Sequence, residues 1–395
     1  MLIQVRNCIV NILSVLIPNK NKRKEFRKKY KKPTKLDRLI KRVDLLTETI
    51  NKKLNIPAKN MIEHVRYRDN EIAKEIKQYA DLINPNMFVI GQKTILLADE
   101  QIENIKSIEV KVKNGVYKFR ENKCLCGKED DQIIAIRDRY GSKLITVICK
   151  NCGLVRLNPY FDDETIGKFY NTEFDHIYER GRKDFNNDFN SKIRAGNGII
   201  KLLKDNGVLV ENKRVYEIGC AGGGILKAFQ NIGCNVSGSD YNAGMIESGK
   251  LKGLDLMVGG IECFKNKPLA DIVILSHVLE HVTTPIEVLK SIRNILQEDG
   301  HLFIAVPTID ALRHGSYGYN LSVYFINAHV WYFTLSSLSY VLGCAGFECK
   351  NIGYGTVIAT KTPNFRDVKD IDKNEYNHAI NLFNETKEIF WDLKK

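Results

Sequence analysis

Apolar and polar residues follow one another in the second half of the chain in a pattern typical of a sheet covered by helices. Short apolar runs predict buried strands, and amphipathic segments between them predict helices. Strands are expected at residues 215–218, 235–239, 255–258, 272–275 and 301–306, with a final hairpin at 347–360. Helices are expected at 185–206, 225–232, 241–250 and 285–296. The alternation predicts an α/β fold of the Rossmann-like, doubly wound kind, with a mostly parallel seven-stranded sheet.

The first of these strands leads into a glycine-rich turn with the sequence EIGCAGGG. Glycines let the backbone approach a ligand closely because no Cβ is in the way, and the next helix begins with free N–H groups directed at the same place. The second strand ends at Asp240, 23 residues after Glu217. A carboxylate there can accept hydrogen bonds from both ribose hydroxyls of a nucleoside. For the glycines alone, a tight connection without a ligand is the simpler alternative.

The run EIGCAGGG and the later GSD resemble the cofactor motifs of class I S-adenosylmethionine-dependent methyltransferases. The family pattern is acid-x-Gly-x-Gly-x-Gly, and this chain has alanine in place of the middle glycine. The segments ADIVILSHVLEHV, LQEDGHLFIAVP and HVWYFTLSSLSYVLGCAGFE extend the resemblance over residues 185–360. It implies S-adenosylmethionine as cofactor, with Glu217 ordering the turn and the cofactor's amino-acid end and Asp240 holding the ribose. The implied cofactor-binding residues are Glu217, Gly219, Ala221, Gly223, Asp240, Tyr241, Ile261 and Ser276.

Three histidines are candidates for catalysis on the acceptor side: His277, His281 and His329. The first two follow the fourth strand, and ligands of such sheets bind beyond the carboxyl ends of the strands. With Glu280 they also spell H-x-x-E-H, an inverted zinc-protease motif, but that motif requires a helix and a protease fold. Some related RNA and ubiquinone-pathway O-methyltransferases bind a divalent ion through E-x-x-E-H. His277 replaces the first glutamate here, and Mg²⁺ prefers oxygen ligands, so bracing of the pocket wall is an equal alternative.

His329 and Tyr332 resemble the H-x-x-Y-F segment of sugar C-methyltransferases. The resemblance implies that both side chains face the acceptor and that His329 acts as a general base, a task that its ordinary titration range suits. A histidine of the core or of a lid is the alternative interpretation.

Two close pairs of cysteines, each followed by glycine, predict a zinc ribbon at residues 121–160. Four thiolates close a tetrahedral site, so the ion would be structural. The first pair is C-x-C instead of C-x-x-C, and four reduced core cysteines are the alternative. The segment after it resembles the one that joins zinc knuckles to methyltransferase domains in enzymes that often act on sugars. The predicted zinc ligands are Cys124, Cys126, Cys149 and Cys152.

The N-terminal segment, residues 1–34, is apolar up to Pro18 and then strongly basic. This order suits a helix in a membrane interface whose basic residues, up to residue 32, contact anionic lipids. A solvated basic tail is the alternative. The charges do not precede the apolar stretch, which argues against a signal peptide, and no apolar run is long enough for a transmembrane helix. Ten cysteines without a secretion signal favour a cytoplasmic protein, peripheral on the inner face of the membrane if this segment is an anchor.

Predictions also follow for the remaining segments. Residues 35–120 are expected to be helical and then strand-rich, with a hairpin at Asn114-Gly115. An apolar stripe at 36–54 suits either a coiled-coil dimer or a core face. Residues 308–328 are expected to form a lid-like loop, and residues 361–395 a polar helical tail.

The sequence therefore predicts a methyltransferase that acts on a saccharide: a cell-surface glycan, a sugar nucleotide or a lipid-linked sugar. Residues 1–123 carry a net charge of +14 against +13 for the whole chain, so the remainder is near neutral, which argues against binding of nucleic acid there. An O-methyltransferase of RNA or a small molecule is the alternative. A non-catalytic scaffold, in which the zinc ribbon and basic region bind a partner, is a hypothesis of a different class.

Overall fold

The computed structural model describes residues 97–178, 185–367 and 374–392, all within the compact unit Glu63–Lys395. Predictions for the N-terminal segment and for the stripe at 36–54 lie outside these residues. Membrane association through residues 1–32 and oligomerisation through 36–54 therefore stay predictions. Within the described ranges, no helix has both the length and the apolar character needed to cross a membrane.

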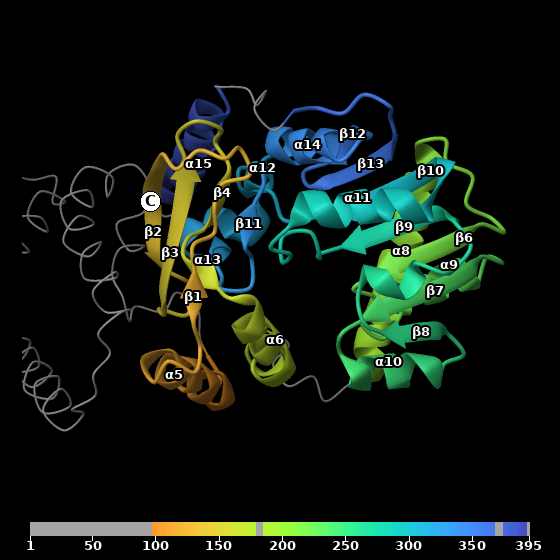
Figure 1. Cartoon of the computed structure of the whole chain (residues 1–395), viewed down its shortest axis with the longest axis horizontal. Coiled ribbons are helices and arrows are strands. Elements are labelled where there is room, and N and C mark those ends of the chain that lie inside the picture. The colour runs from red at the N-terminus through yellow and green to blue at the C-terminus, as the bar shows by residue number, and fades with distance from the viewer. Residues whose placement is uncertain (1–96, 179–184, 368–373, 393–395) are drawn as a thin grey trace, which may run out of the picture. The chain divides into compact units, whose positions relative to one another are not determined.

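Seven strands form one sheet in the order β12-β13-β10-β9-β6-β7-β8 (Figure 1). All neighbours pair in parallel except β13, which is antiparallel to β10 and β12. The predicted mostly parallel Rossmann-like sheet is confirmed, and the strand order reverses beside β6, where such folds bind ligands. The strands are β6 (Arg214–Ile218), β7 (Asn235–Asp240), β8 (Asp255–Val258), β9 (Ala270–Ser276), β10 (Leu296–Ala305), β12 (Phe347–Gly353) and β13 (Thr356–Lys361).

Helices cover both faces of this sheet because alternate strand residues point to opposite sides. On one face, Val215 and Ile272 pack in a core with α8 (Phe185–Asp205), α9 (Gly224–Gln230) and α10 (Ala243–Lys250). On the other face, Tyr216 and Val273 pack with α11 (Pro285–Ile295), α14 (Leu335–Cys344) and the short η2 (Ile261–Phe264). Each fully buried aliphatic side chain contributes about 1.5–3 kcal/mol to folding.

A second sheet of four antiparallel strands has the order β11-β4-β3-β2. Its strands are β2 (Asp131–Arg137), β3 (Lys143–Cys149), β4 (Val155–Leu157) and β11 (Trp331–Tyr332), with a separate pair β1 (Phe119–Arg120) and β5 (Tyr160–Phe161). We call it the cysteine sheet, because two of the predicted zinc ligands precede β2, one is the last residue of β3 and one follows β3. β11 comes from the later part of the region expected at 185–360, so the two predicted regions share a sheet.

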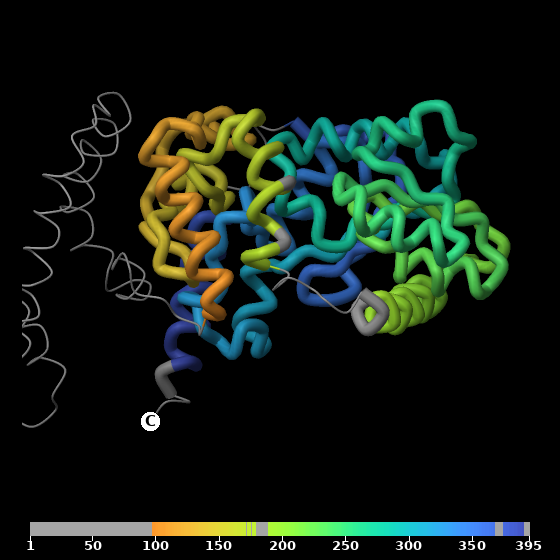
Figure 2. Tube along the Cα trace, turned by 90° about the horizontal axis from the view of Figure 1, so that it is seen from below, coloured from red at the N-terminus to blue at the C-terminus, as the bar shows by residue number. Residues whose placement is uncertain are grey.

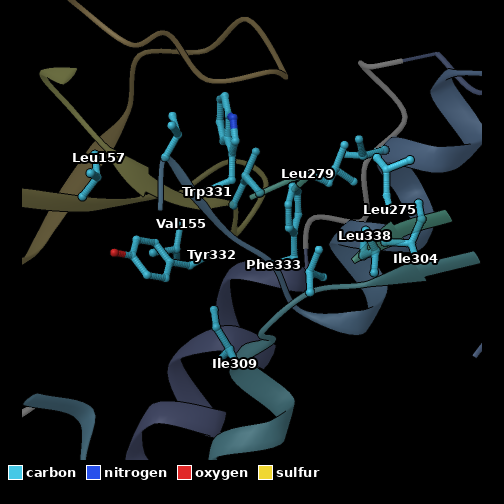
Figure 3. Close-up of a cluster of buried hydrophobic side chains, with 14 of the residues drawn as sticks. Val155, Leu157, Leu275, Leu279, Ile304, Ile309, Trp331, Tyr332, Phe333 and Leu338 are labelled. Atoms are coloured by element: carbon cyan, nitrogen blue, oxygen red, sulfur yellow. The ribbon is translucent and has the colours of Figure 1, made fainter. Parts of the chain in front are cut away.

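A single buried cluster joins the cysteine sheet to the large sheet. In Figure 3, Trp331 and Tyr332 lie near Val155 and Leu157 of the cysteine sheet. Phe333 lies between these residues and Leu275, Ile304 and Leu338, which belong to the side of the large sheet. All of these side chains are at most 1% exposed. The cysteine sheet is therefore part of the same hydrophobic core as one face of the large sheet.

In the described part of residues 35–120 the predicted hairpin is wrong, and β1 (Phe119–Arg120) is the one strand found where a strand-rich segment was expected. Asp99–Lys113 form helix α5, because Ile102, Ile105 and Ile108 recur at helical spacing and make one apolar stripe. Asn114 and Gly115 end this helix instead of turning a hairpin, with Gly115 at φ +71°. α5 packs along α7 (Phe174–Tyr178), as Figure 2 shows in orange and yellow-green.

Two other segments are more buried than predicted. Residues 308–328 form α12 (Ile309–Leu312), η3 (Ser316–Tyr319) and α13 (Leu321–Tyr324), and Tyr324 and Phe325 are fully buried, so this segment is not an open lid. The predicted polar tail forms α15 (Glu375–Asp392), which lies beside β2 and β3 in Figure 1. Its buried residues recur at helical spacing: Glu375, Ala379, Leu382, Phe383 and Thr386.

The contact between α15 and the cysteine sheet can be tested with two glycines that both adopt left-handed φ. A Cβ on Gly153 (φ +68°) would lie 2.5 Å from the backbone carbonyl carbon of Glu375, whereas one on Gly127 (φ +72°) would meet nothing within 4 Å. We expect Gly127→Ala to lower the free energy of unfolding by about 1–2 kcal/mol, the cost of a left-handed alanine. Gly153→Ala should lose roughly 2 kcal/mol more, because α15 must move. Urea denaturation measures both, and equal losses would contradict the described packing.

Candidate functional site

The glycine-rich turn between β6 and α9 keeps a left-handed backbone at each position of the motif. Gly219, Ala221 and Gly223 have φ of +72°, +47° and +75°. A Cβ on Gly219 would collide with the side chain of Val278, and one on Gly223 would lie 2.7 Å from Leu254. Ala221 adopts the conformation that the missing glycine would favour, at a cost of about 1–2 kcal/mol. The alanine therefore leaves the path of the turn unchanged.

Asp240, at the end of β7, holds this turn in place. Its Oδ2 accepts a hydrogen bond from the Ala221 N–H at 2.8 Å, and its Oδ1 accepts one from the Asn242 N–H at 2.8 Å. An ionised carboxylate offers about four lone-pair sites. Asp240 can therefore fix the turn and still accept hydrogen bonds from a ligand's hydroxyl groups.

Glu217 lies below the turn and is 2% exposed. Its Oε2 is buried without a hydrogen-bond partner among the described residues. Burial raises the pKa of Glu217 to about 8, against the opposing effect of the nearby Lys192 cation. A buried carboxyl oxygen without a partner, next to a glycine turn, fits a ligand that brings a cationic group such as the ammonium of S-adenosylmethionine.

The other predicted cofactor-binding residues lie at the carboxyl ends of the neighbouring strands. The Tyr241 hydroxyl is next to Gly260, where a Cβ would meet it at 2.6 Å. Ile261 begins η2 directly after Gly260, whose N–H donates to Glu262 Oε1 at 2.7 Å. Ser276 is the last residue of β9. The structure therefore brings the whole predicted set to one edge of the sheet.

The three predicted catalytic histidines surround Glu280, which follows β9 and is fully buried. Glu280 Oε1 lies 3.4 Å from His277 Nδ1, 3.7 Å from His281 Nε2 and 4.0 Å from His329 Nε2. Neither carboxylate oxygen has a hydrogen-bond partner in the described part of the chain. We call these four residues the Glu280 cluster. Three of them, without His277, are close enough to share a divalent ion.

Backbone hydrogen bonds bring His329 to this cluster from a distant part of the sequence. The Glu280 carbonyl oxygen accepts from the Val330 N–H at 2.8 Å and the Trp331 N–H at 3.2 Å. Val330 in turn accepts from the Leu157 N–H of β4 at 3.0 Å. His277 has the rare φ of +58° and no helix surrounds it, so the helix that the H-x-x-E-H protease motif needs is absent from this described segment.

Burial keeps two of the histidines neutral. It lowers the pKa of His281, and it holds the pKa of His329 well below its ordinary value, with a further lowering by His281 and the Arg139 cation. His281 Nδ1 lies 2.9 Å from the Ala328 carbonyl oxygen, which can only accept, so Nδ1 carries the proton. Nε2 is then the basic nitrogen, and Glu280 Oε1, 3.7 Å away, would stabilise the imidazolium once Nε2 takes a proton. A fixed tautomer with one unprotonated nitrogen is what a general base requires.

Two tyrosines of this region lie where the amino-acid sequence offers no reason to expect them. Tyr170, on α6 (Asp163–Thr172), places its hydroxyl 3.0 Å from His281 Nδ1 and stacks on Phe174. No spacing or motif in the sequence relates it to His281. Tyr332 does not face an acceptor as expected, because it is fully buried and its hydroxyl donates to the Ile326 carbonyl and accepts from the Ile326 N–H, each at 2.9 Å.

The four predicted zinc ligands converge in a second, separate cluster. The Sγ atom of Cys124 lies 3.3 Å from that of Cys152 and 3.5 Å from that of Cys126, and Cys126 and Cys149 are 3.7 Å apart. Zinc with Zn–S bonds of about 2.3 Å in a tetrahedron requires sulfur separations of about 3.8 Å. All four side chains are buried, so the donor set fits a closed, four-coordinate ion.

The raised pKa of Glu217 predicts a pH dependence of folding. Its carboxyl ionises near 4.5 in the unfolded chain and near 8 in the folded one, so the folded state binds the proton more tightly. Without ligand, stability should fall as pH rises from about 5 to 8, by roughly 2–5 kcal/mol. Glu217→Gln should remove this part of the slope, as urea denaturation at several pH values would reveal. Parallel curves for the two proteins would contradict the assignment.

A family model described as a methyltransferase domain matches residues 192–351, which contain the glycine turn, Asp240 and the Glu280 cluster. The ubiquinone biosynthesis O-methyltransferase of Glaesserella parasuis is 31% identical over 114 residues, 26% of this chain and 48% of that protein. That of Marinobacter nauticus is 26% identical over 191 residues, 44% of this chain and 80% of that protein. The chain thus spans less than half of the first relative.

Solved structures of methyltransferases resemble the chain more distantly. The Burkholderia thailandensis 1,6-didemethyltoxoflavin-N1-methyltransferase has 15% identity and a TM-score of 0.39, covering 59% of this chain and all of that one. A SAM-dependent methyltransferase from Archaeoglobus fulgidus has 24% identity and a TM-score of 0.34, covering 41% of this chain and 74% of that one. Residues 192–351 thus match a methyltransferase domain, and the seven strands of the large sheet have the order and directions of the predicted Rossmann-like fold.

Proposed function

We propose that the enzyme transfers a methyl group from S-adenosylmethionine to a saccharide, with His281 as the general base. The observation that carries this proposal is the convergence of His277, His281 and His329 on the buried Glu280, beyond the end of β9. Val278, between two members of the cluster, packs on Gly219 of the cofactor turn. The residues proposed to remove the proton thus lie next to those proposed to bind the cofactor, at one edge of the sheet.

When bound, S-adenosylmethionine supplies an electrophilic methyl group, so the protein has to orient the acceptor and remove one proton. Glu217 and Asp240 would hold the cofactor's ammonium and ribose. His281 Nε2 would take the acceptor's proton while Ala328 and Tyr170 hold the ring, and Glu280 would stabilise the resulting charge. His277, whose side chain is 60% exposed, would pass the proton to solvent.

Two features support a saccharide as the acceptor. The H-x-x-Y-F segment and the segment after the cysteine pairs resemble those of sugar-modifying methyltransferases. In addition, the Glu280 cluster offers several polar groups to a partner rich in hydroxyls. The sugar could be a nucleotide sugar, a cell-surface glycan or a lipid-linked saccharide.

O-methylation of a small molecule is the second candidate. It is favoured by the curated relatives, which are named as ubiquinone biosynthesis O-methyltransferases. The same base and cofactor site would serve either acceptor, because both reactions require removal of one proton from the acceptor. The two candidates differ in the solubility of the product, which an experiment can separate.

We also propose that Cys124, Cys126, Cys149 and Cys152 hold a structural zinc ion. The sulfur separations support this, as do the glycine-containing turns, in which the Gly127 N–H donates to the Cys124 carbonyl at 2.9 Å and the Gly153 N–H donates to the Cys149 carbonyl at 2.8 Å. With four protein ligands the ion would have no open position, so it would stabilise the cysteine sheet without taking part in methyl transfer.

Incubation with radiolabelled S-adenosylmethionine and a lysate of cells lacking this gene tests the acceptor. We expect label in the fraction of sugar nucleotides or lipid-linked glycans. His281→Gln should retain binding of S-adenosylhomocysteine but lose label by a factor of about 10²–10⁴, because only the base is removed. Asp240→Ala should lose both.

The fractionation also separates the alternatives. Label in a lipophilic small molecule would favour the second candidate, and label in RNA would overturn the saccharide. If His281→Gln kept its full activity, His281 would not be the base.

For the zinc proposal, metal analysis of the full chain should find about one zinc per chain. Cys149→Ala should lose the metal and lower the melting temperature, because three buried thiols cannot replace the bound ion. Cys263→Ala is the matched control, since Cys263 is partly exposed and outside the cluster. A metal-free wild-type protein with an unchanged melting temperature in a chelator would exclude the zinc.

A further inference from the structure

We propose that the acceptor carries an anionic group, a phosphate or a carboxylate, and that Arg139 binds it. This inference deepens the proposed function and rests on it only in placing an acceptor at the Glu280 cluster. Arg139 belongs to the cysteine sheet, so the proposal gives that sheet a part in substrate recognition besides any structural ion.

A rigid turn presents Arg139 between β2 and β3. The Asp138 N–H donates to the Ser142 carbonyl at 3.0 Å, and Asp138 Oδ1 accepts from the N–H groups of Tyr140 at 2.9 Å and Ser142 at 3.0 Å. The Asp138 carboxyl is therefore engaged with the backbone of its own turn. Burial also raises the pKa of Asp138 to about 7, which reduces the negative charge that it offers to Arg139.

The same turn docks on the segment that precedes His329. The Arg139 N–H donates to the Phe325 carbonyl at 3.0 Å, and the guanidinium carbon lies 5.7 Å from the ring centre of Tyr317. The charge of Arg139 lowers the pKa of His329, and Tyr317 is within electrostatic range of both Arg139 and Glu280. The guanidinium thus lies on the side of the Glu280 cluster that faces the cysteine sheet.

Arg139 has no carboxylate partner among the described residues. Its guanidinium hydrogen-bonds the Tyr317 side chain, but its Nε is buried without a hydrogen-bond acceptor. By contrast, Arg156 of the same sheet makes two hydrogen bonds to Asp131, at 2.9 and 2.8 Å. A buried guanidinium N–H without an acceptor is costly, and its planar fork suits the oxygens of phosphate or carboxylate.

An anionic acceptor would satisfy this donor while its reacting group lies over His281. The fixed positive charge of Arg139 also balances the negative charge of Glu280, so the site as a whole does not repel an anion. Among saccharides, a phosphate group would indicate a sugar nucleotide or a phosphate-linked sugar, and a carboxylate would indicate a sugar acid.

Calorimetric titration of the full chain, saturated with S-adenosylhomocysteine so that the cofactor site is filled, tests this inference. The probes are UDP-glucose, glucuronate and glucose. We expect UDP-glucose or glucuronate to bind at least about tenfold more tightly than glucose, the effect of one charge-assisted hydrogen bond. UDP-glucose as the preferred probe would identify a phosphate, and glucuronate a carboxylate.

Substitutions test whether Arg139 causes the preference for UDP-glucose or glucuronate over glucose. Arg139→Gln should abolish the preference for the anionic probes. Arg139→Lys keeps the charge but loses the planar guanidinium, so it should keep part of the preference. The lysine variant serves as the test if the glutamine variant does not fold. Lys143→Gln removes a charge from the exposed end of the same hairpin and should change affinity less than twofold.

Equal binding of all three probes to the wild type would overturn the proposal, and so would a preference that survives Arg139→Gln. Because the readout is binding, it stays distinct from the labelling experiment. Absence of label from saccharides would defeat the proposed acceptor without affecting an Arg139-dependent preference for anions.

Discussion

The pairing of Trp331–Tyr332 with β4 is the interaction on which the arrangement of this protein depends. It places a segment that follows the fifth strand of the large sheet into the cysteine sheet. The adjacent Val330 and Trp331 N–H groups then donate to the Glu280 carbonyl, in the loop that follows β9. One short strand therefore connects two sheets, their common core and the loop that carries the catalytic candidates.

Two buried carboxylates define the chemistry of the site. Glu217 and Glu280 are at most 2% exposed, and each has at least one oxygen without a partner among the described residues. A buried polar group without a partner is costly, so these positions are expected to gain hydrogen bonds or charge partners when ligands bind. Glu217 lies under the glycine-rich turn and Glu280 lies among histidines, so the same physical feature occurs at both parts of the candidate site.

Backbone strain is concentrated at the same edge of the sheet. Ala221 and His277 both have positive φ, and each follows the carboxyl end of a parallel strand. Such conformations cost of order 1–3 kcal/mol and persist where the surroundings impose them. Here the hydrogen bond from Ala221 to Asp240 and that from the His277 N–H to the Ala305 carbonyl, at 2.8 Å, impose them.

The sequence by itself determined the large sheet and the cofactor edge. Strand and helix periods, the glycine turn and the acid at Asp240 are local signals. The spacing of apolar residues within an element indicates which of its faces is buried. The same local reasoning failed at Asp99–Lys113, which was expected to be strand-rich although its apolar residues recur at helical spacing. It also suggested that residues 308–328 were an open loop, because short helices with mixed composition carry little periodic signal.

Only the tertiary structure decided the composition of the acceptor side. Tyr170, Glu280 and His329 come from three separated segments, and Arg139 from a fourth, so no spacing in the sequence relates them. Tyr332 shares a motif with His329, yet the pairing of β11 buries it and leaves His329 beside Glu280. Local periodicity records which face of an element is buried, whereas the partners across that face depend on long-range strand pairing and packing.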